Sequence, residues 1–132
     1  MKKHLFQLLG LVALALLTQT AQAQNTAQKA PWKEMKEFHE VMSVTFHSAE
    51  EKNFAPLKEK SGLLVERAMA WKKSTIPAGF KPELTAQVLK RLVKECKKVD
   101  KMVKKGKSDE ELMKGINAAH DVFHEIVGKC RE

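Results

Sequence analysis

The chain has 132 residues, with 24 Lys and Arg against 16 Asp and Glu, a formal net charge of +8, two Cys, six Gly and no Tyr. This length fits one domain with a modest core and excludes a large two-domain enzyme. With 30% charged and 43% hydrophobic residues, the composition excludes a disordered chain and a membrane protein with several spans, and its long Lys/Glu/Leu-rich stretches favour helices.

Residues 1–23 have the pattern of a secretory signal. Lys2 and Lys3 precede an almost wholly apolar run over 5–17, and small residues at 21 and 23 fit a cleavage site. The run is short for a membrane anchor, although an uncleaved anchor is the alternative. We expect a mature chain from about Gln24, exported to a bacterial periplasm or secreted, without a transmembrane segment. Removing Lys2 and Lys3 leaves 22 basic and 16 acidic residues, a net charge of +6.

After a polar leader at 24–31, residues 32–132 are predicted to form one helical domain. Apolar residues recur at helical spacing over 32–47. The run Ser48-Ala49-Glu50-Glu51 fits a capping box and predicts a break there. A second helix is predicted over 56–73, and the breaker-rich stretch 75–82 is predicted to be a loop.

The last two helices have clearer signals at their ends. A third helix is predicted to begin near Pro82, with a seam of Leu89, Leu92, Cys96, Val99 and Val103, and to end at Gly106. A second capping box at 108–111 opens a fourth helix. Short connections imply antiparallel neighbours, so the sequence predicts an all-α, up-down-up-down four-helix bundle.

The two cysteines are predicted not to pair within one chain. Cys96 lies ten residues before Gly106 and Cys130 lies 24 residues after it. In a straight helical hairpin these offsets differ by roughly 20 Å along the axis, whereas a disulfide needs a Cα separation of about 4.4–6.8 Å. Cys96 is therefore expected to be a core residue, and Cys130 a free thiol or a link in a homodimer.

The histidines carry the chemical signal of the mature chain. They occur only at 39, 47, 120 and 124, on the predicted first and last helices. His120 and His124 have the i, i+4 spacing that allows two imidazoles to reach one metal ion. Aligning the two helices from Trp32 and Arg131 places His39 level with His124, and His47 level with about Ile116. Methionines near these histidines add thioether donors, which suit copper or haem iron; they are Met35, Met42 and Met113.

The sequence resembles the cytochrome c′ family and the related soluble b-type four-helix cytochromes. The resemblance covers the export signal, the length and the helix layout, and is most specific at Ala119-His120-Asp121-Val122-Phe123. It implies that His120 occupies the position of the haem-ligating histidine. Ile116 and Ala119 stand where the haem-linking cysteines would be, so covalent haem is not expected. In the b-type relatives a first-helix Met and a last-helix His hold haem, an arrangement that Met35 or Met42 could imitate with His120 or His124.

Three hypotheses follow. The first is a non-enzymatic metal-binding protein that holds copper, zinc, nickel or cobalt through His39, His120 and His124, with His47 and Met42 as auxiliary ligands. The second is a b-type haem protein for electron transfer, with ligands such as Met42 and His120. The third is an interaction module in which the histidines are incidental.

The eight basic residues of the predicted third helix are interpreted first as a solvated face. They could instead dock an acidic redox or metal-transfer partner, or an anionic membrane. A nucleic-acid partner is not expected, because export removes it and no groove-reading motif is present. A hydrolase is not expected either, because neither a nucleophile elbow nor a zinc-protease motif is present.

Overall fold

The computed structural model describes residues 32–132, so the predicted export signal and leader lie outside the described residues. This part of the chain contains four helices and no strand. They are α1 (Lys33–Glu50), α2 (Ala55–Lys73), α3 (Pro82–Lys104) and α4 (Asp109–Gly128). The all-α class is therefore confirmed, and the arrangement fits the predicted four-helix bundle. Within residues 32–132, no helix combines the length and the apolar character needed to cross a bilayer.

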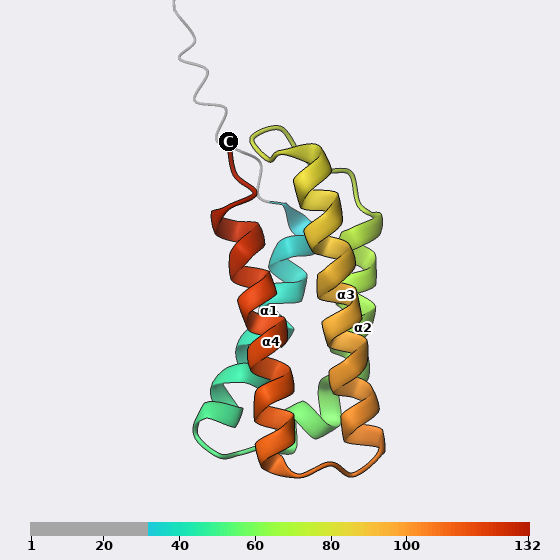
Figure 1. Cartoon of the computed structure of the whole chain (residues 1–132), viewed down its shortest axis with the longest axis vertical. Coiled ribbons are helices and arrows are strands. Elements are labelled where there is room, and N and C mark those ends of the chain that lie inside the picture. The colour runs from blue at the N-terminus through green and yellow to red at the C-terminus, as the bar shows by residue number, and fades with distance from the viewer. Residues whose placement is uncertain (1–31) are drawn as a thin grey trace, which may run out of the picture.

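Each helix packs beside the next one in the chain, and α4 returns to α1 (Figure 1). The helices α1 and α4 form one side of the bundle, and α2 and α3 form the opposite side. The backbones of α1 and α4 come together at far fewer points than those of the other three neighbouring pairs. The backbones of α1 and α4 therefore stand further apart than those of the other neighbouring helices.

The predicted apolar stripes of the four helices meet in a single core. Their central members are fully or almost fully buried because 3.6-residue periodicity places them on one face of each helix. The fully enclosed residues include Phe38, Met42, Leu57, Leu64, Trp71, Leu92, Val99, Leu112, Ile116 and Ile126. Val103, the last residue of the predicted α3 seam, is only partly buried, against the edge of this core.

Aromatic side chains fill the end of the core where the chain of α1 begins. Trp71 is fully buried and lies within about 6 Å of Phe38, Phe123 and Trp32, measured between ring centroids. Trp32 also packs edge-on against Phe80 from the loop between α2 and α3, and its indole nitrogen donates a 2.8 Å hydrogen bond to the Ser74 hydroxyl. This cluster joins α1, α2, α4 and the long loop at one end of the bundle.

One of the two predicted capping boxes is present. The Ser108 hydroxyl accepts a hydrogen bond from the Glu111 backbone, and the Glu111 carboxylate accepts one from the Ser108 backbone. These bonds satisfy donors that the first turn of α4 would otherwise leave free, and they lower the pKa of Glu111. The capping box predicted at 48–51 is wrong, because α1 continues to Glu50. The helix continues through this stretch because Phe46 and Ala49 are buried in the core.

The two cysteines do not pair, as the helix offsets predicted, and both are buried. Cys96 lies in the middle of α3, where burial raises the pKa of its thiol to about 12. Cys130 follows α4 in a short chain end that is tied to the α2–α3 loop by a hydrogen bond from the Lys81 backbone to the Cys130 carbonyl. Its side chain has no exposed surface, so the predicted link between two chains through Cys130 is not accessible in this fold.

The C-terminal end of α1 generates a first testable prediction. Lys52 has a φ of 63°, a left-handed conformation that costs a non-glycine residue about 1–2 kcal/mol. Replacing Lys52 with Gly should therefore raise the free energy of unfolding by about 1 kcal/mol, less than the full cost because glycine also gains entropy in the unfolded chain. Urea denaturation measures the change.

The matched control is Lys90→Gly, at an exposed position inside α3. Glycine in a helix interior should lower the stability by about 1 kcal/mol. An equal loss of stability in both variants would show that the backbone at Lys52 is not strained.

Candidate functional site

Three consecutive cavities lie along the seam between α1 and α4. Their volumes are about 340 Å³ near Trp32, 380 Å³ in the middle and 580 Å³ at the turn end. His39 and Phe123 line both of the first two cavities, and Glu50 lines both of the last two. Neighbouring cavities thus share wall residues, and we refer to the three together as the α1–α4 groove.

All four predicted histidines line the middle cavity of the groove. His39 and His47 come from α1, and His120 and His124 come from α4. The structure thus brings the four residues to one cavity, as their confinement to the first and last helices predicted. Their rings nevertheless take part in three separate sets of contacts.

His120 and His124 form a close pair. Their Nε2 atoms are 3.1 Å apart, because residues four apart on a helix stand one above the other. A hydrogen bond between two ring nitrogens requires one nitrogen to carry a proton and the other to be bare, so one of the rings is neutral in this pair. The pKa of His120 is lowered, first by burial and then by the charge of His124. Both causes favour an unprotonated ring, which is the form that binds metals.

Phenylalanine rings hold two of the histidines in place. Phe46 lies flat on His120, with ring centroids 3.7 Å apart and an interplanar angle of 4°. Phe123 stacks in the same way on His39, at 5.3 Å and 11°. Phe46 therefore fixes His120 from the opposite helix. The simple helix alignment placed His47, the neighbour of Phe46, level with about Ile116. The contact between Phe46 and His120 lies about one turn further along α4.

His47 is directed elsewhere, because its Nδ1 lies 2.9 Å from a carboxylate oxygen of Glu50 one turn further along α1. In the part of the chain from Trp32 to Glu132, no three His, Cys, Asp or Glu side chains are close enough together to hold one metal ion. The predicted group of His39, His120 and His124 is therefore not assembled here. The His120–His124 pair is the part of it that is formed.

Each cavity of the groove also contains a methionine. Met35 lines the cavity near Trp32, Met42 the histidine cavity and Met113 the cavity at the turn end. Met42 is almost fully buried, with 1% of its surface exposed. It therefore forms part of the inner wall of the cavity that the histidines also line.

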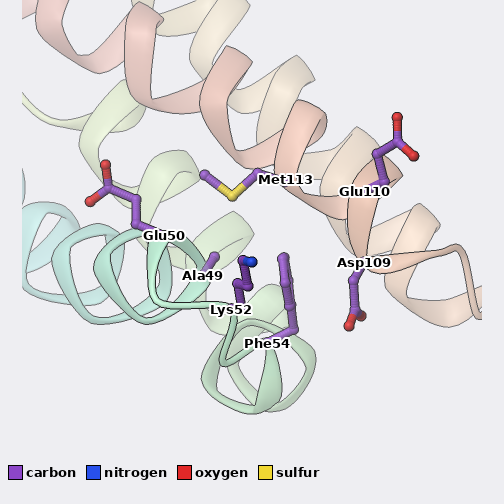
Figure 2. A pocket seen from close by; sticks show the side chains of 7 residues that line it. All are labelled: Ala49, Glu50, Lys52, Phe54, Asp109, Glu110 and Met113. Atoms are coloured by element: carbon purple, nitrogen blue, oxygen red, sulfur yellow. The ribbon is translucent and has the colours of Figure 1, made fainter.

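The cavity at the turn end is apolar inside and charged at its rim. Figure 2 shows Phe54 and the Lys52 side chain extending from one side of this cavity, with the side chain of Met113 lying across the other side. The carboxylates of Asp109 and Glu110 are turned away from this space. Because its inner wall offers no group of converging polar atoms, this cavity extends the groove but adds no ligands to the histidine cavity.

The charged residues of the helices that border the groove are mostly acidic. Together α1 and α4 carry 3 Lys and 9 Asp or Glu, a difference of −6. The two helices that border the groove are therefore acidic as a pair, although the whole chain is basic, and Lys36 and Lys52 occur in its lining together with Glu50.

Sequence reasoning missed two neighbours of the histidines. Phe46 lies in the stretch 32–47 for which the sequence predicts only a helix, yet its ring is the platform for His120. Glu50 was assigned to a capping box, but its carboxylate pairs with His47. The three-residue spacing of His47 and Glu50 could have indicated their contact. Nothing in the sequence could have indicated the stacking of Phe46, because it depends on how α1 and α4 are aligned.

Comparison with models of protein families, with characterised proteins and with solved structures gives no match for this chain. Its function is therefore inferred from the geometry of the groove.

The lowered pKa of His120 makes a prediction about stability and pH. The unfolded chain takes up a proton at this ring near the ordinary value of 6.5, whereas the folded chain resists protonation to lower pH. Stability should therefore fall as the pH drops from about 7 through 6.5 and below, until the folded form is protonated as well. Urea denaturation across this range measures the slope.

Replacing His120 with Gln should remove this part of the slope. The variant His39→Gln changes an exposed ring in the same groove and should retain it. If His120→Gln and wild type had the same pH dependence between about 5 and 7, protonation of His120 would not be coupled to folding.

Proposed function

We propose that the protein binds a transition-metal ion through the Nε2 atoms of His120 and His124. The observation that supports this proposal is the 3.1 Å separation of these two atoms. Two imidazoles on one ion, with bonds of about 2.0–2.1 Å and tetrahedral angles, have their nitrogens about 3.3 Å apart. When an ion replaces the shared proton, the two nitrogens need to move apart by only a few tenths of an ångström. The pair therefore needs little rearrangement to bind the ion.

The environment of the pair favours a metal with a preference for nitrogen and sulfur ligands. Met42 contributes a thioether to the same cavity, and soft sulfur ligands select copper over harder ions. His39 and His47 line the cavity as well, and either could add a nitrogen after a change of side-chain rotamer. Copper is therefore the ion that this set of donors suits best, with zinc, nickel and cobalt as the other candidates.

Haem b does not suit the arrangement of the same residues. Met42 and His120 line one cavity, as the resemblance to b-type cytochromes implies. However, the His120 nitrogen that would bind iron is directed at His124, and Phe46 covers the face of the ring. Before haem could bind, His120 would have to lose its contacts with both His124 and Phe46. We therefore place the bare ion ahead of haem.

The proposed role is binding without catalysis. The pattern of residues 1–23 supports export, and we propose that the protein works in the periplasm or outside the cell. There it would buffer, sequester or sense the ion. A two-histidine site with a partly exposed ring and an open cavity fits such a role, because an ion with few protein ligands can be exchanged rapidly.

Metal binding is tested with the tag-free chain from which residues 1–23 have been removed. Calorimetric titration with Cu²⁺, Zn²⁺, Ni²⁺ and Co²⁺ should show one ion per chain, with copper bound most tightly. The double variant His120→Ala/His124→Ala should lose stoichiometric binding. The matched control His39→Ala/His47→Ala removes two histidines from the same cavity and should weaken binding by about tenfold or less.

Equal affinity in wild type and the His120/His124 double variant would overturn the site. An absorption spectrum of the protein purified from its natural compartment tests haem separately. A Soret band that persists through dialysis would establish the haem protein and reject the bare-ion site.

A further inference from the structure

The side of the bundle opposite the α1–α4 groove carries a cleft lined by lysines. Its volume is about 320 Å³, and its lining residues are Lys72 of α2 with Lys90, Val93, Lys94 and Lys97 of α3. Val93 is almost buried and forms the apolar floor, whereas the four lysines are exposed. We call this feature the lysine cleft.

The four lysines are left without ion-pair partners in the described part of the chain. None of them takes part in an ion pair found among residues 32–132. The nearby acidic residues of α3 are already used, because Glu95 pairs with Lys98 and Asp100 pairs with Lys104. A cluster of four like charges without counter-charges repels itself, and this repulsion is relieved when an anionic surface covers it.

The cleft continues as a stripe along α3. Lys90, Lys94, Lys97 and Lys101 follow one another at intervals of four, three and four residues, so they share one face and extend over about 16 Å. Together α2 and α3 carry 12 Lys or Arg and 5 Asp or Glu, a difference of +7, against −6 for α1 and α4. The bundle therefore has a strong electric dipole directed across its axis, from the groove side to the α2–α3 side (Figure 1).

We infer that the protein docks on an anionic phospholipid surface through the lysine cleft and stripe, with the α1–α4 groove facing away from the membrane. Each lysine near such a surface is attracted to the lipid headgroups, and the attraction is greatest where basic residues lie side by side. The acidic helices α1 and α4 are repelled by the same surface, so the dipole selects one orientation.

A lipid surface suits this face better than an acidic protein does. Lysine ammonium groups are flexible point charges that follow a mobile, laterally continuous array of phosphates. A specific protein partner would be expected to meet aromatic and arginine anchors, whereas the cleft itself contains only lysines around one valine. The inference does not depend on metal binding, because the groove and the cleft are on opposite sides.

Sedimentation with vesicles tests the inference. The tag-free mature chain should bind vesicles of phosphatidylcholine that contain phosphatidylglycerol, and not vesicles of phosphatidylcholine alone. Binding should be lost between about 0.05 M and 0.5 M salt, because screening shortens the range of the attraction. The variant with Lys72, Lys90, Lys94 and Lys97 all replaced by Gln should bind at least about tenfold more weakly.

The control replaces Lys33, Lys36, Lys107 and Lys114 with Gln, which changes the net charge equally but leaves the cleft intact. It should bind as tightly as wild type. If vesicle binding were weakened equally in both variants, net charge alone would explain it, and the proposed docking face would be overturned. An absence of vesicle binding by the wild type would overturn the inference in favour of an acidic protein partner. Circular dichroism checks that both variants are folded.

The orientation is tested with a fluorescent label on single added cysteines. The native Cys96 is enclosed in the core, and Cys130 is replaced with Ser in both labelled variants so that opening of the chain end cannot expose a second thiol. A label at Gln87→Cys, three residues before Lys90 on α3, should be shielded from an aqueous quencher when the protein is on vesicles. A label at Val44→Cys on α1, where the native side chain is 49% exposed, should remain accessible. Equal shielding at both positions would overturn the proposed orientation.

Discussion

The contacts of Phe123 help to close the seam of the bundle in which the helix backbones stand apart. Its ring lies within about 6 Å of Phe38 and Trp71 in the core and stacks on His39 at the surface. Aromatic rings can fill such a gap because each buries a large area with few rotatable bonds. The same separation of α1 and α4 that needs these rings also leaves room for the cavities on either side of them.

The histidine pair is a consequence of this loose seam. In a tightly packed seam, apolar residues would occupy the positions of His120 and His124. Here the wider spacing admits imidazole rings at the boundary between core and solvent, and Phe46 supplies the flat surface against which His120 rests. The groove therefore brings together imidazole rings from two helices and the buried side chain of Met42.

Charge is divided between the helices in a way that also holds the bundle together. The ion pairs between helices each join an acidic helix to a basic one, as in Glu37–Arg67, Glu125–Arg91 and Asp109–Lys58. Exposed pairs of this kind stabilise a fold only weakly. They hold each acidic helix against a basic one. The placement of α1 beside α4 and of α2 beside α3 brings like charges together, so it rests on the apolar core and on the short connections rather than on these pairs.

Most of the fold could be predicted from the sequence, because the apolar stripes, Pro82, Gly106 and the Ser108 capping box are local signals. The end of α1 could not, because the burial of Ala49 outweighed the capping pattern at Ser48. The His120–His124 contact followed from helix geometry alone. The positions of His39 and His47 depended on rotamers and on the alignment of two distant helices, which no local pattern specifies.

The two free thiols are exposed to solvent by different motions of the protein. Cys96 is enclosed at mid-height in α3, where access for a thiol reagent requires the bundle to come apart. Cys130 is enclosed by a chain end that two backbone hydrogen bonds, from Lys81 and Glu132, tie to the long loop. Release of this short segment exposes Cys130 while the helices remain packed. The reaction rates of the two sulfurs therefore separate fraying at the C-terminus from global unfolding within a single unmodified chain.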